Sequence, residues 1–351
     1  MTEMDFNTAQ NLKRPFYIDV RSPGEYALDH IPGALNLPLF SDEERVHIGT
    51  VYRQLDQKQA RYLGLEIITP KLVSLLRQLE GLLTEGQPVI YCWRGGMRSK
   101  ALYQMARLLQ IPCHRLLGGY KGYRQEVNNY FAASCPFRIV VLHGLTGCGK
   151  TRILQTLLRE GQVQVIDLEG LAQNRGSVFG GVGLKEQPSQ KRFESQLFEA
   201  MTSFDPAYSL IVECESKRIG KLFLPLTFYR AMQEGRHFLL FGSLAERTRR
   251  IIEEYRPWEK KEEIVEALSK IKERLGKEKI LELISLVKTG NYLPVVEYLL
   301  EFYYDPLYNY PNKADNGYEI SLCSDNEERA ARELTDYLSK AAAPQAIRNK
   351  I

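Results

Sequence analysis

Short apolar runs alternate with segments of helical periodicity along the first part of the chain. Apolar runs of strand length stand at 16–20 and 88–91, and residues 70–83 and 100–109 repeat apolar side chains at helical spacing. Strands that alternate with helices in this way are typical of a sheet covered by helices. We therefore predict an α/β domain over residues 1–130.

The alternation restarts after an aromatic and polar stretch, residues 120–137, which we expect to connect two domains. The next predicted strands and their first helix lie at 138–143, 151–159 (helix), 162–166, 209–213 and 237–241. Apolar strands separated by helices favour a parallel sheet. We predict a second α/β domain over residues 136–351, with a charged helical insertion at about 246–304.

Composition agrees with two folded domains. A chain of 351 residues exceeds what one core usually organises, and its apolar fraction of 44% is too high for disorder. The net charge of +4 permits an RNA partner without indicating one. The first residues contain no apolar leader and no stretch is long enough to cross a bilayer, so we expect a cytoplasmic protein without a membrane partner. The six cysteines lack metal-ligand spacing, so a structural zinc site is not expected.

One cysteine lies in a loop suited to nucleophilic chemistry. Cys92 follows an apolar run and precedes a helix, and Gly95 and Gly96 allow the backbone between them to curl around an anion. Loop N–H groups together with Arg94 and Arg98 favour the thiolate form of the cysteine. These three side chains are the predicted catalytic residues. The alternative is a buried cysteine at an ordinary strand-to-helix turn.

The segment upstream of that loop resembles a known family. Residues 19–26 (DVRSPGEY) and 30–36 (HIPGALN) resemble the N-terminal signature of the rhodanese family, whose members carry sulfur as a cysteine persulfide. The resemblance implies one α/β domain over about residues 10–125, with Cys92 as carrier of sulfur or selenium. The loop from Cys92 to Arg98 is longer than in most sulfurtransferases and has the spacing of phosphatases that share the fold. A phosphatase therefore stays open.

A second loop matches a phosphate-binding pattern. Residues 144–151 (GLTGCGKT) fit GxxxxGK[ST] and stand between a predicted strand and a predicted helix, which is a specific signal for a P-loop NTPase-like domain. Loop N–H groups and Lys150 are expected to bind a diphosphate, and the Thr151 hydroxyl to reach Mg²⁺. The predicted diphosphate-binding residues are Gly144, Thr146, Gly147, Gly149, Lys150 and Thr151.

Carboxylates follow two later strands of this domain. Glu213 ends an apolar run and is the candidate to hold the metal through water, whereas Asp167 and Glu169 follow the preceding strand, near the expected acceptor. We predict all three as metal or acceptor-site residues. For Glu213 and Asp167, simple solvation at a strand end is an equally weighted interpretation.

Two further segments narrow the family. Residues 167–180 (DLEGLAQNRGSVFG) and 187–191 (QPSQK), together with both loops, resemble the bacterial tRNA 2-selenouridine synthases over nearly the whole chain. The resemblance implies action on tRNA with 2-thiouridine at the wobble position, first S-geranylation with geranyl diphosphate and then selenation with selenophosphate. Asn174 stands where the family's motif leads us to expect histidine, which weakens a general-base role there.

The residues agree with such a division of labour. A P-loop lysine and Mg²⁺ stabilise a departing diphosphate, as alkylation by an allylic diphosphate requires, without ATP hydrolysis. The thiolate of Cys92 is expected to take selenium as a selanyl adduct and deliver it to the base. We therefore predict a geranyltransferase and selenotransferase acting on tRNA.

Basic residues supply the predicted ligand contacts. Arg175 and Ser177 lie in a glycine-flanked motif near the expected phosphate site, and we predict that both contact substrate. Arg247 and Arg250, with Arg249 between them, are predicted to contact tRNA phosphates from a helix or to close over the diphosphate. Acidic neighbours on that helix make a solvated face with ion pairs an equal alternative.

Other functions stay open on these residues. One is a rhodanese-fold phosphatase, and another is an ATP-dependent kinase or sulfurtransferase in which one loop regulates the other. A non-catalytic RNA-binding module is a third, but the intact Cys92, Lys150 and Thr151 argue against it.

Overall fold

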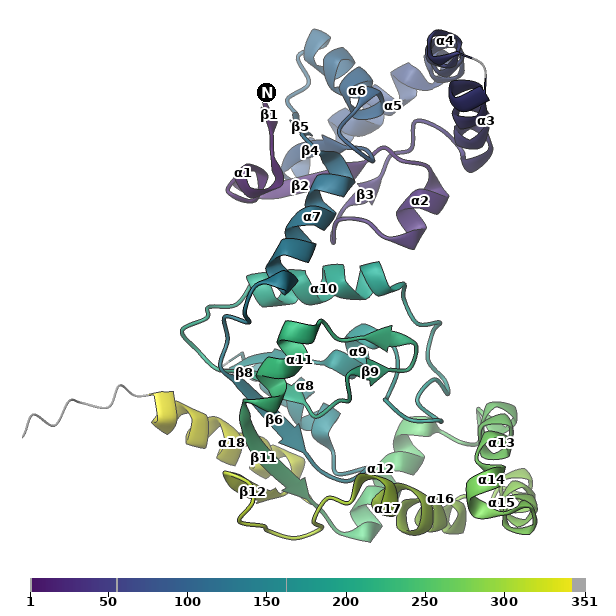
Figure 1. The fold of residues 1–351 in the computed structure, drawn as a ribbon, viewed down its shortest axis with the longest axis vertical. Coiled ribbons are helices and arrows are strands. Elements are labelled where there is room, and N and C mark those ends of the chain that lie inside the picture. The colour runs from purple at the N-terminus through teal and green to yellow at the C-terminus, as the bar shows by residue number, and fades with distance from the viewer. Residues whose placement is uncertain (1, 55, 162, 343–351) are drawn as a thin grey trace, which may run out of the picture. The chain divides into compact units, whose positions relative to one another are not determined.

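The computed structural model describes residues 2–54, 56–161 and 163–342. They form two compact units, which are coloured along the chain in Figure 1. The first unit contains the chain up to Ala133 together with Ser189–Glu199, and the second contains Ser134–Pro188 and the chain from Ala200 onward. The sequence predicts two continuous domains, whereas a short segment from the middle of the chain packs with the first unit.

A parallel sheet organises the first unit. Its five strands lie in the order β1 (Glu3–Met4), β5 (His114–Leu116), β4 (Gln87–Tyr91), β2 (Pro15–Asp19) and β3 (Leu35–Asn36). Asp19 pairs with Tyr91 at the ends of β2 and β4, so the loops that follow these two strands leave the sheet side by side. The apolar runs at 16–20 and 88–91 thus form the predicted strands.

Helices cover this sheet. They are α1 (Phe6–Gln10), α2 (Pro23–Leu28), α3 (Asp42–Gln54), α4 (Gln57–Ile68), α5 (Leu72–Gly81), α6 (Met97–Leu108), α7 (Gly119–Ala132) and the first part of α10 (Gln190–Thr202), with single 3₁₀ turns at Thr69–Lys71 and Leu82–Thr84. The stretch predicted as a connector is mostly the helix α7. It folds because Tyr120, Tyr123 and Val127 lie on one face and are buried in the core.

The second unit contains another parallel sheet. Its strands lie in the order β12 (Ile320–Cys323), β11 (Arg236–Phe241), β6 (Ile139–His143), β8 (Leu210–Glu213) and β7 (Gln164–Ile166), and a small hairpin pairs β9 (Arg218–Ile219) with β10 (Leu222–Phe223). Leu142 pairs with Glu213, and Ile166 pairs with Val212. The segments that follow β6, β7 and β8 therefore meet at one edge of the sheet.

Helices surround this sheet and extend beyond it. They are α8 (Lys150–Glu160), α9 (Leu168–Ala172), the end of α10, α11 (Leu226–Gln233), α12 (Leu244–Tyr255), α13 (Lys261–Lys270), α14 (Lys272–Leu275), α15 (Lys277–Thr289), α16 (Leu293–Leu299), a π-helical segment (Leu300–Tyr304), α17 (Asp305–Tyr308) and α18 (Glu327–Ala342). The helices from α13 to the π-helical segment share a separate apolar cluster around Leu268, Leu283 and Leu299.

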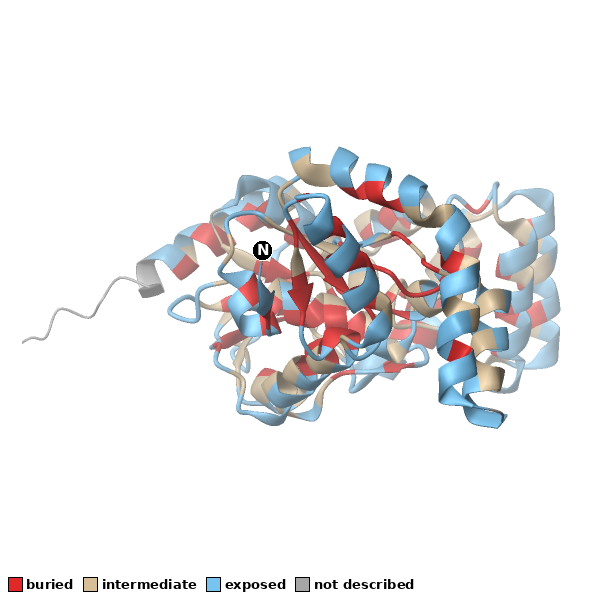
Figure 2. Ribbon diagram, turned by 90° about the horizontal axis from the view of Figure 1, so that it is seen from above, coloured by how far each residue is buried: buried red, intermediate tan, exposed pale blue. Residues whose placement is uncertain are grey.

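Burial follows the predicted pattern. Figure 2 shows buried residues along the strands and on the inner faces of the helices. The α/β class of both domains is confirmed. Within the part of the chain that the structure describes, no helix is both long enough and apolar enough to span a membrane.

Candidate active sites

Cys92 directly follows β4, the central strand of the first sheet, and so lies where the carboxyl ends of the strands meet. Its side chain is buried, and its Sγ lies 3.2 Å from the Ser99 Oγ in the first turn of α6. The backbone N–H of Tyr120 donates to the Cys92 carbonyl oxygen over 2.9 Å. A Cβ at Gly119, whose φ is +56°, would overlap that oxygen, so glycine is required here. The thiol is thus held in a fixed position by α6 and α7.

The loop after Cys92 turns tightly and carries the two predicted arginines. Gly95 has a φ of +64°, and Arg115 donates to its carbonyl oxygen. The Arg98 guanidinium lies 2.7 Å from the Glu25 carboxylate in α2. Burial favours a raised pKa for Glu25, but the guanidinium groups of Arg98 and Arg45 outweigh it and lower the pKa. Arg94 is exposed.

A cavity of about 590 Å³ opens over this loop within the first unit. Its lining includes Arg98, Trp93 and Tyr120, and from the start of α10 it includes Gln190 and Lys191. Cys92, which precedes Trp93 in the chain, is buried and is not part of the lining. The contribution of α10 was missed by the sequence analysis because no local pattern links residue 190 to a loop a hundred residues earlier.

The rhodanese-like signature has a structural explanation. Arg21 is buried, with its Nη2 atom 2.6 Å from Asp19 and 2.7 Å from the carbonyl oxygen of Asp29, to which it donates. Its guanidinium also stacks over the Tyr120 ring, 4.1 Å from the centroid. The pair of Asp19 and Arg21 therefore fixes the loop after β2 beside the cysteine loop.

The phosphate loop connects β6 to α8. Three of its glycines have positive φ, namely Gly144, Gly147 and Gly149. A Cβ at Gly147 would lie 2.9 Å from the carbonyl oxygen of Arg247, so this close approach requires glycine. Lys150 begins α8 and donates through Nζ to the Gly144 carbonyl oxygen over 2.8 Å. The ammonium group thus lies across the loop where a phosphate would bind.

A charged pocket surrounds this loop within the second unit. It brings together these predicted residues: Gly144, Thr146, Gly147, Gly149, Lys150, Thr151, Glu169, Arg175, Ser177 and Arg250. Asp167, Glu213 and Arg247 do not line it. Sequence reasoning missed other lining side chains, among them Glu215, Tyr308 and Tyr310. The sequence signal for Glu215 was its position, two residues beyond the end of the predicted strand at 209–213.

The predicted carboxylates form a connected group at the ends of β7 and β8. Thr151 donates from Oγ1 to Glu169 over 3.2 Å, and the Glu169 N–H donates to Glu213 Oε1 over 2.6 Å. Asp167 instead caps α9 by accepting from the Gly170 N–H. Burial raises the pKa of Glu169, Glu213 and Glu215, and neighbouring carboxylates raise those of Glu213 and Glu215 further.

These oxygens fit a magnesium ion. The hydroxyl of Thr151 and the carboxylates of Glu169 and Glu215 line the charged pocket beside Lys150, whereas Glu213, the predicted metal residue, does not line it. No three His, Cys, Asp or Glu side chains in that part of the chain could enclose a metal by themselves. Mg²⁺ commonly takes one or two carboxylates together with substrate phosphate oxygens. Thr151, Glu169 and Glu215 would hold it in this way.

The glycine-flanked motif forms one wall of the charged pocket. Arg175 forms an ion pair with Glu254 and stacks over Tyr255, with its Cζ 4.8 Å from the ring centroid. Ser177 accepts from the Phe179 N–H over 3.2 Å. Asn174 accepts from the Gly176 N–H over 2.9 Å, so in this chain it shapes the turn.

Two arginines predicted to contact tRNA are buried instead. Arg247 donates from Nε to the Thr146 carbonyl oxygen over 2.8 Å and pairs with Asp305. Arg250 lies 2.6 Å from Glu327 and donates to the Ser324 carbonyl oxygen. Both side chains point into the protein because the phosphate loop packs on their face of α12. They brace that loop, and Arg250 also lines the charged pocket, as expected of a residue that closes over a diphosphate, whereas neither side chain is exposed on the surface.

The fold and the two loops define a class: a rhodanese-like domain joined to a P-loop domain. A family model described as a rhodanese-like domain matches residues 5–126, and one described as the tRNA 2-selenouridine synthase AAA domain matches residues 137–343. This chain belongs to the tRNA 2-selenouridine synthase family, as its curated relatives also show.

Three relatives, each named tRNA 2-selenouridine synthase, illustrate the match. The protein of Hydrogenovibrio crunogenus is 35% identical over 85% of this chain and 90% of its own length. Those of Chromohalobacter salexigens and Nitrosomonas eutropha are 39% and 37% identical over 63% and 62% of this chain. The matches to these two cover only 60% and 56% of the relatives' lengths.

Proposed function

We propose that this chain converts wobble 2-thiouridine in tRNA to 2-selenouridine in two transfers. The first is S-geranylation with geranyl diphosphate at the phosphate loop, and the second is selenation with selenophosphate through Cys92. One observation carries the proposal: in each unit a glycine-containing loop connects a strand of the parallel sheet to the N-terminus of a helix, and the two loops carry different chemical groups. One presents a lysine and a hydroxyl, and the other a thiol and an arginine.

The phosphate loop suits the departure of a diphosphate. In the first transfer the thiocarbonyl sulfur forms a bond to the allylic carbon, the carbon–oxygen bond breaks, and its electron pair leaves with the diphosphate. Negative charge therefore grows on the oxygens next to Lys150 and the loop N–H groups, which stabilise it. Bound Mg²⁺ would add its positive charge at the same oxygens, held by Thr151 and Glu169.

The cysteine loop suits an oxyanion donor. The lining of the cavity over it carries four cationic side chains and two carboxylates, and its net positive charge favours a phosphate-like group. The cations are Arg21, Arg45, Arg98 and Lys191, and the carboxylates are Glu25 and Asp29. Cys92 begins this loop, and Ser99 can exchange a hydrogen bond with its buried thiol.

We propose that the Cys92 thiolate attacks the phosphorus of selenophosphate, so that a sulfur–phosphorus bond forms, the selenium–phosphorus bond breaks and selenide leaves with the electron pair. The selenide then adds to C2 of the base, the geranylthiolate departs from the same carbon, and water releases phosphate from Cys92. A selanyl adduct on Cys92 would require a two-electron oxidant in addition, because selenium in selenophosphate is at the selenide level.

Two variants test the division of labour. Lys150→Ala should abolish geranylation, because the leaving group loses its cation, yet it should still selenate tRNA that already carries S-geranyl-2-thiouridine. Cys92→Ser should show the opposite pattern. Nucleoside mass spectrometry after incubation with each donor measures both products. Cys323→Ser, which changes an exposed thiol, serves as control.

Three results would contradict the proposal. If either variant fails equally on both substrates, the two transfers share one composite site. Strict dependence on ATP would favour a kinase or an ATP-dependent sulfurtransferase, and phosphate release from an aryl phosphate that depends on Cys92 would favour a phosphatase.

A further inference from the structure

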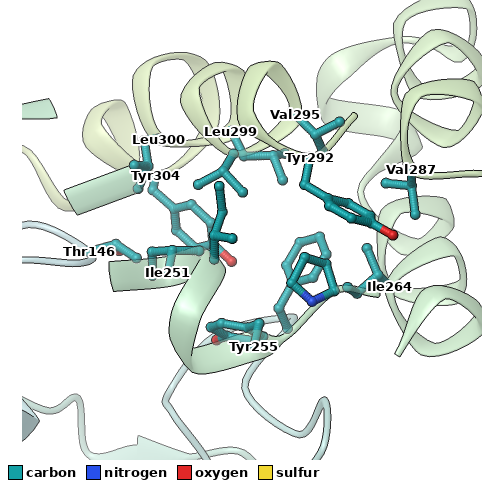
Figure 3. Close-up of a pocket in the computed structure, with 14 residues that line it drawn as sticks. Thr146, Ile251, Tyr255, Ile264, Val287, Tyr292, Val295, Leu299, Leu300 and Tyr304 are labelled. Atoms are coloured by element: carbon teal, nitrogen blue, oxygen red, sulfur yellow. The ribbon is translucent and has the colours of Figure 1, made fainter. Parts of the chain in front are cut away.

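An apolar pocket adjoins the phosphate loop inside the second unit, and Figure 3 shows its lining. The lining residues are Thr146, Phe179, Ile251, Ile252, Tyr255, Pro257, Ile264, Val287, Tyr292, Val295, Val296, Leu299, Leu300 and Tyr304. Thr146, Ile251 and Tyr255 also line the charged pocket. The two pockets therefore adjoin each other at these three residues.

The lining suits a hydrocarbon better than a nucleotide base. None of the described residues that line it carries a charge, and Val287, Val295 and Leu300 are almost fully buried. The Tyr304 hydroxyl is already used, since it donates to Ser177 over 3.3 Å. A buried base would need hydrogen-bond partners for several polar atoms, whereas an aliphatic chain needs none.

Polarity changes abruptly where the two pockets meet. On one side stand Lys150, Arg152 and Glu169, and on the other, apart from the shared Thr146, only aliphatic and aromatic side chains. A ligand that fills both has a charged head and an apolar tail. We propose that this pocket binds the hydrocarbon chain of the allylic diphosphate whose head group lies on the phosphate loop. The identity of that chain as geranyl rests on the proposed function, but the pocket's preference for an apolar chain does not.

The far end of the pocket sets the length of chain that it accepts. In Figure 3, Thr146 lies at one end, and Val287 and Tyr292 lie toward the other, next to Ile264. Ile264, Val287 and Tyr292 come from α13, α15 and the segment before α16, respectively. A larger side chain at Val287 would shorten the pocket, and a smaller one at Tyr292 would lengthen it.

Equilibrium binding to the full chain in Mg²⁺ tests the proposal. The probes are inorganic diphosphate and its dimethylallyl, geranyl and farnesyl esters, with affinities measured by calorimetry. Affinity should rise by about fourfold for each methylene group that the pocket buries. Val287→Trp should remove most of the gain from dimethylallyl to geranyl while leaving the affinity for inorganic diphosphate unchanged. Leu281→Trp, on an exposed position of the same helix, should change neither.

A second variant covers the case in which Val287→Trp fails to fold. Tyr292 is only partly buried, so Tyr292→Ala should be tolerated, and its smaller side chain should lengthen the pocket. The ratio of farnesyl to geranyl diphosphate affinity should therefore rise relative to the unchanged chain. Equal affinities across the series, or equal losses for all four probes in Val287→Trp, would overturn the proposal. A loss of ATP affinity in Val287→Trp without any chain-length effect would also overturn it, in favour of a nucleotide base.

The outcomes separate this proposal from the proposed function. Chain-dependent affinity without any geranylated tRNA in the mass spectrum would support the pocket and refute geranylation. Geranylated tRNA with a flat affinity series would support geranylation and refute the pocket.

Discussion

The buried carboxyl group of Glu213 makes the stability of the folded protein depend on pH. Its pKa lies well above the ordinary value of 4.5, first because it is buried and then because Asp167 and Glu169 are near. In the folded protein the carboxyl therefore keeps a proton that the unfolded chain loses above that pH. Stability that depends on this proton is present at low pH and declines as pH rises from 4.5 toward the raised pKa.

Glu213→Gln should remove this dependence, because the amide imitates the neutral acid and its Oε1 can still accept from the Glu169 N–H. In the unchanged chain this proton should make the free energy of unfolding fall by up to about 1.4 kcal/mol per pH unit above pH 4.5. In Glu213→Gln that contribution to the fall should be absent. Urea unfolding at a series of pH values measures it. Glu160→Gln, an exposed carboxyl of the same unit, is the control. An unchanged slope in Glu213→Gln would show that Glu213 is ionised in the folded state.

Local motifs predicted some site residues, and only the sheet order could give the others. Lys150 and Thr151 follow from one contiguous pattern, and the structure places both in the charged pocket. Glu215 joins Glu169 there because β8 lies beside β7, a pairing between segments about fifty residues apart. The pattern of one strand does not specify its neighbour, so the sequence could not rank Glu215 above Asp167.

At the scale of elements, α12 shows that the position of an arginine around the helix decides whether its side chain is buried or exposed. Its three arginines, Arg247, Arg249 and Arg250, do not all lie on the same side of the helix. Arg247 and Arg250 are buried against the phosphate loop, whereas Arg249 is half-exposed and pairs with Glu246 and Glu253. Residues three apart share a face of a helix, so the inward pair follows from the spacing once the packed face is known.

Arg247→Ala should therefore act on stability and loop geometry. Loss of its charge-assisted bonds to Asp305 and Thr146 should cost about 1.5–3 kcal/mol of unfolding free energy. The salt dependence of tRNA binding should stay unchanged, because the guanidinium does not face solvent. Arg249→Ala is the matched variant on the same helix and should cost under about 0.5 kcal/mol. Urea unfolding and tRNA binding at several salt concentrations measure the two effects.

A reduced salt slope would reverse this assignment. If Arg247→Ala lowers the log–log slope by about 0.7, that side chain reaches an RNA phosphate and the buried conformation is not the one that binds tRNA. If Arg249→Ala alone lowers it, the exposed side of α12 is the contact surface.

Strong periodicity predicted elements well, and weak periodicity did not. Strands β2, β4, β6, β8 and β11 follow apolar runs, and α8 follows the phosphate motif. Helix α3 has no buried residue, so its sequence lacks an apolar stripe and it was not predicted. Helix α7 was predicted as a connector because its buried face consists of tyrosines, a residue type that is as common on surfaces as in cores.

At the scale of the whole molecule, the chain passes between its two units more than once. It leaves the first unit after Ala133, returns for Ser189–Glu199, and leaves again. The returning segment is the first part of α10, and its contacts within the first unit are polar as well as apolar. Ser195 donates to Asp29 over 3.1 Å, and Phe198 joins the aromatic cluster around Tyr123.

Arg124 on α7 joins the returning segment to the rest of the first unit. It donates to the Lys191 carbonyl oxygen over 3.0 Å and to the Ser195 Oγ over 2.9 Å, and it pairs with Glu194. The side chain is 8% exposed, so water replaces these bonds poorly. The first unit therefore depends on a segment that the sequence places inside the second domain.

Arg124→Ala should destabilise the first unit by about 1.5–3 kcal/mol, because charge-assisted hydrogen bonds are lost at a buried position. The two tryptophans allow each unit to be followed separately, since Trp93 belongs to the first and Trp258 to the second. In a Trp258→Phe background, fluorescence during urea unfolding reports on the first unit, and in a Trp93→Phe background on the second. The midpoint should fall for the first unit and stay nearly unchanged for the second. Equal shifts in both backgrounds would show that the units unfold together, and no shift in either would show that α10 contributes no stability through Arg124.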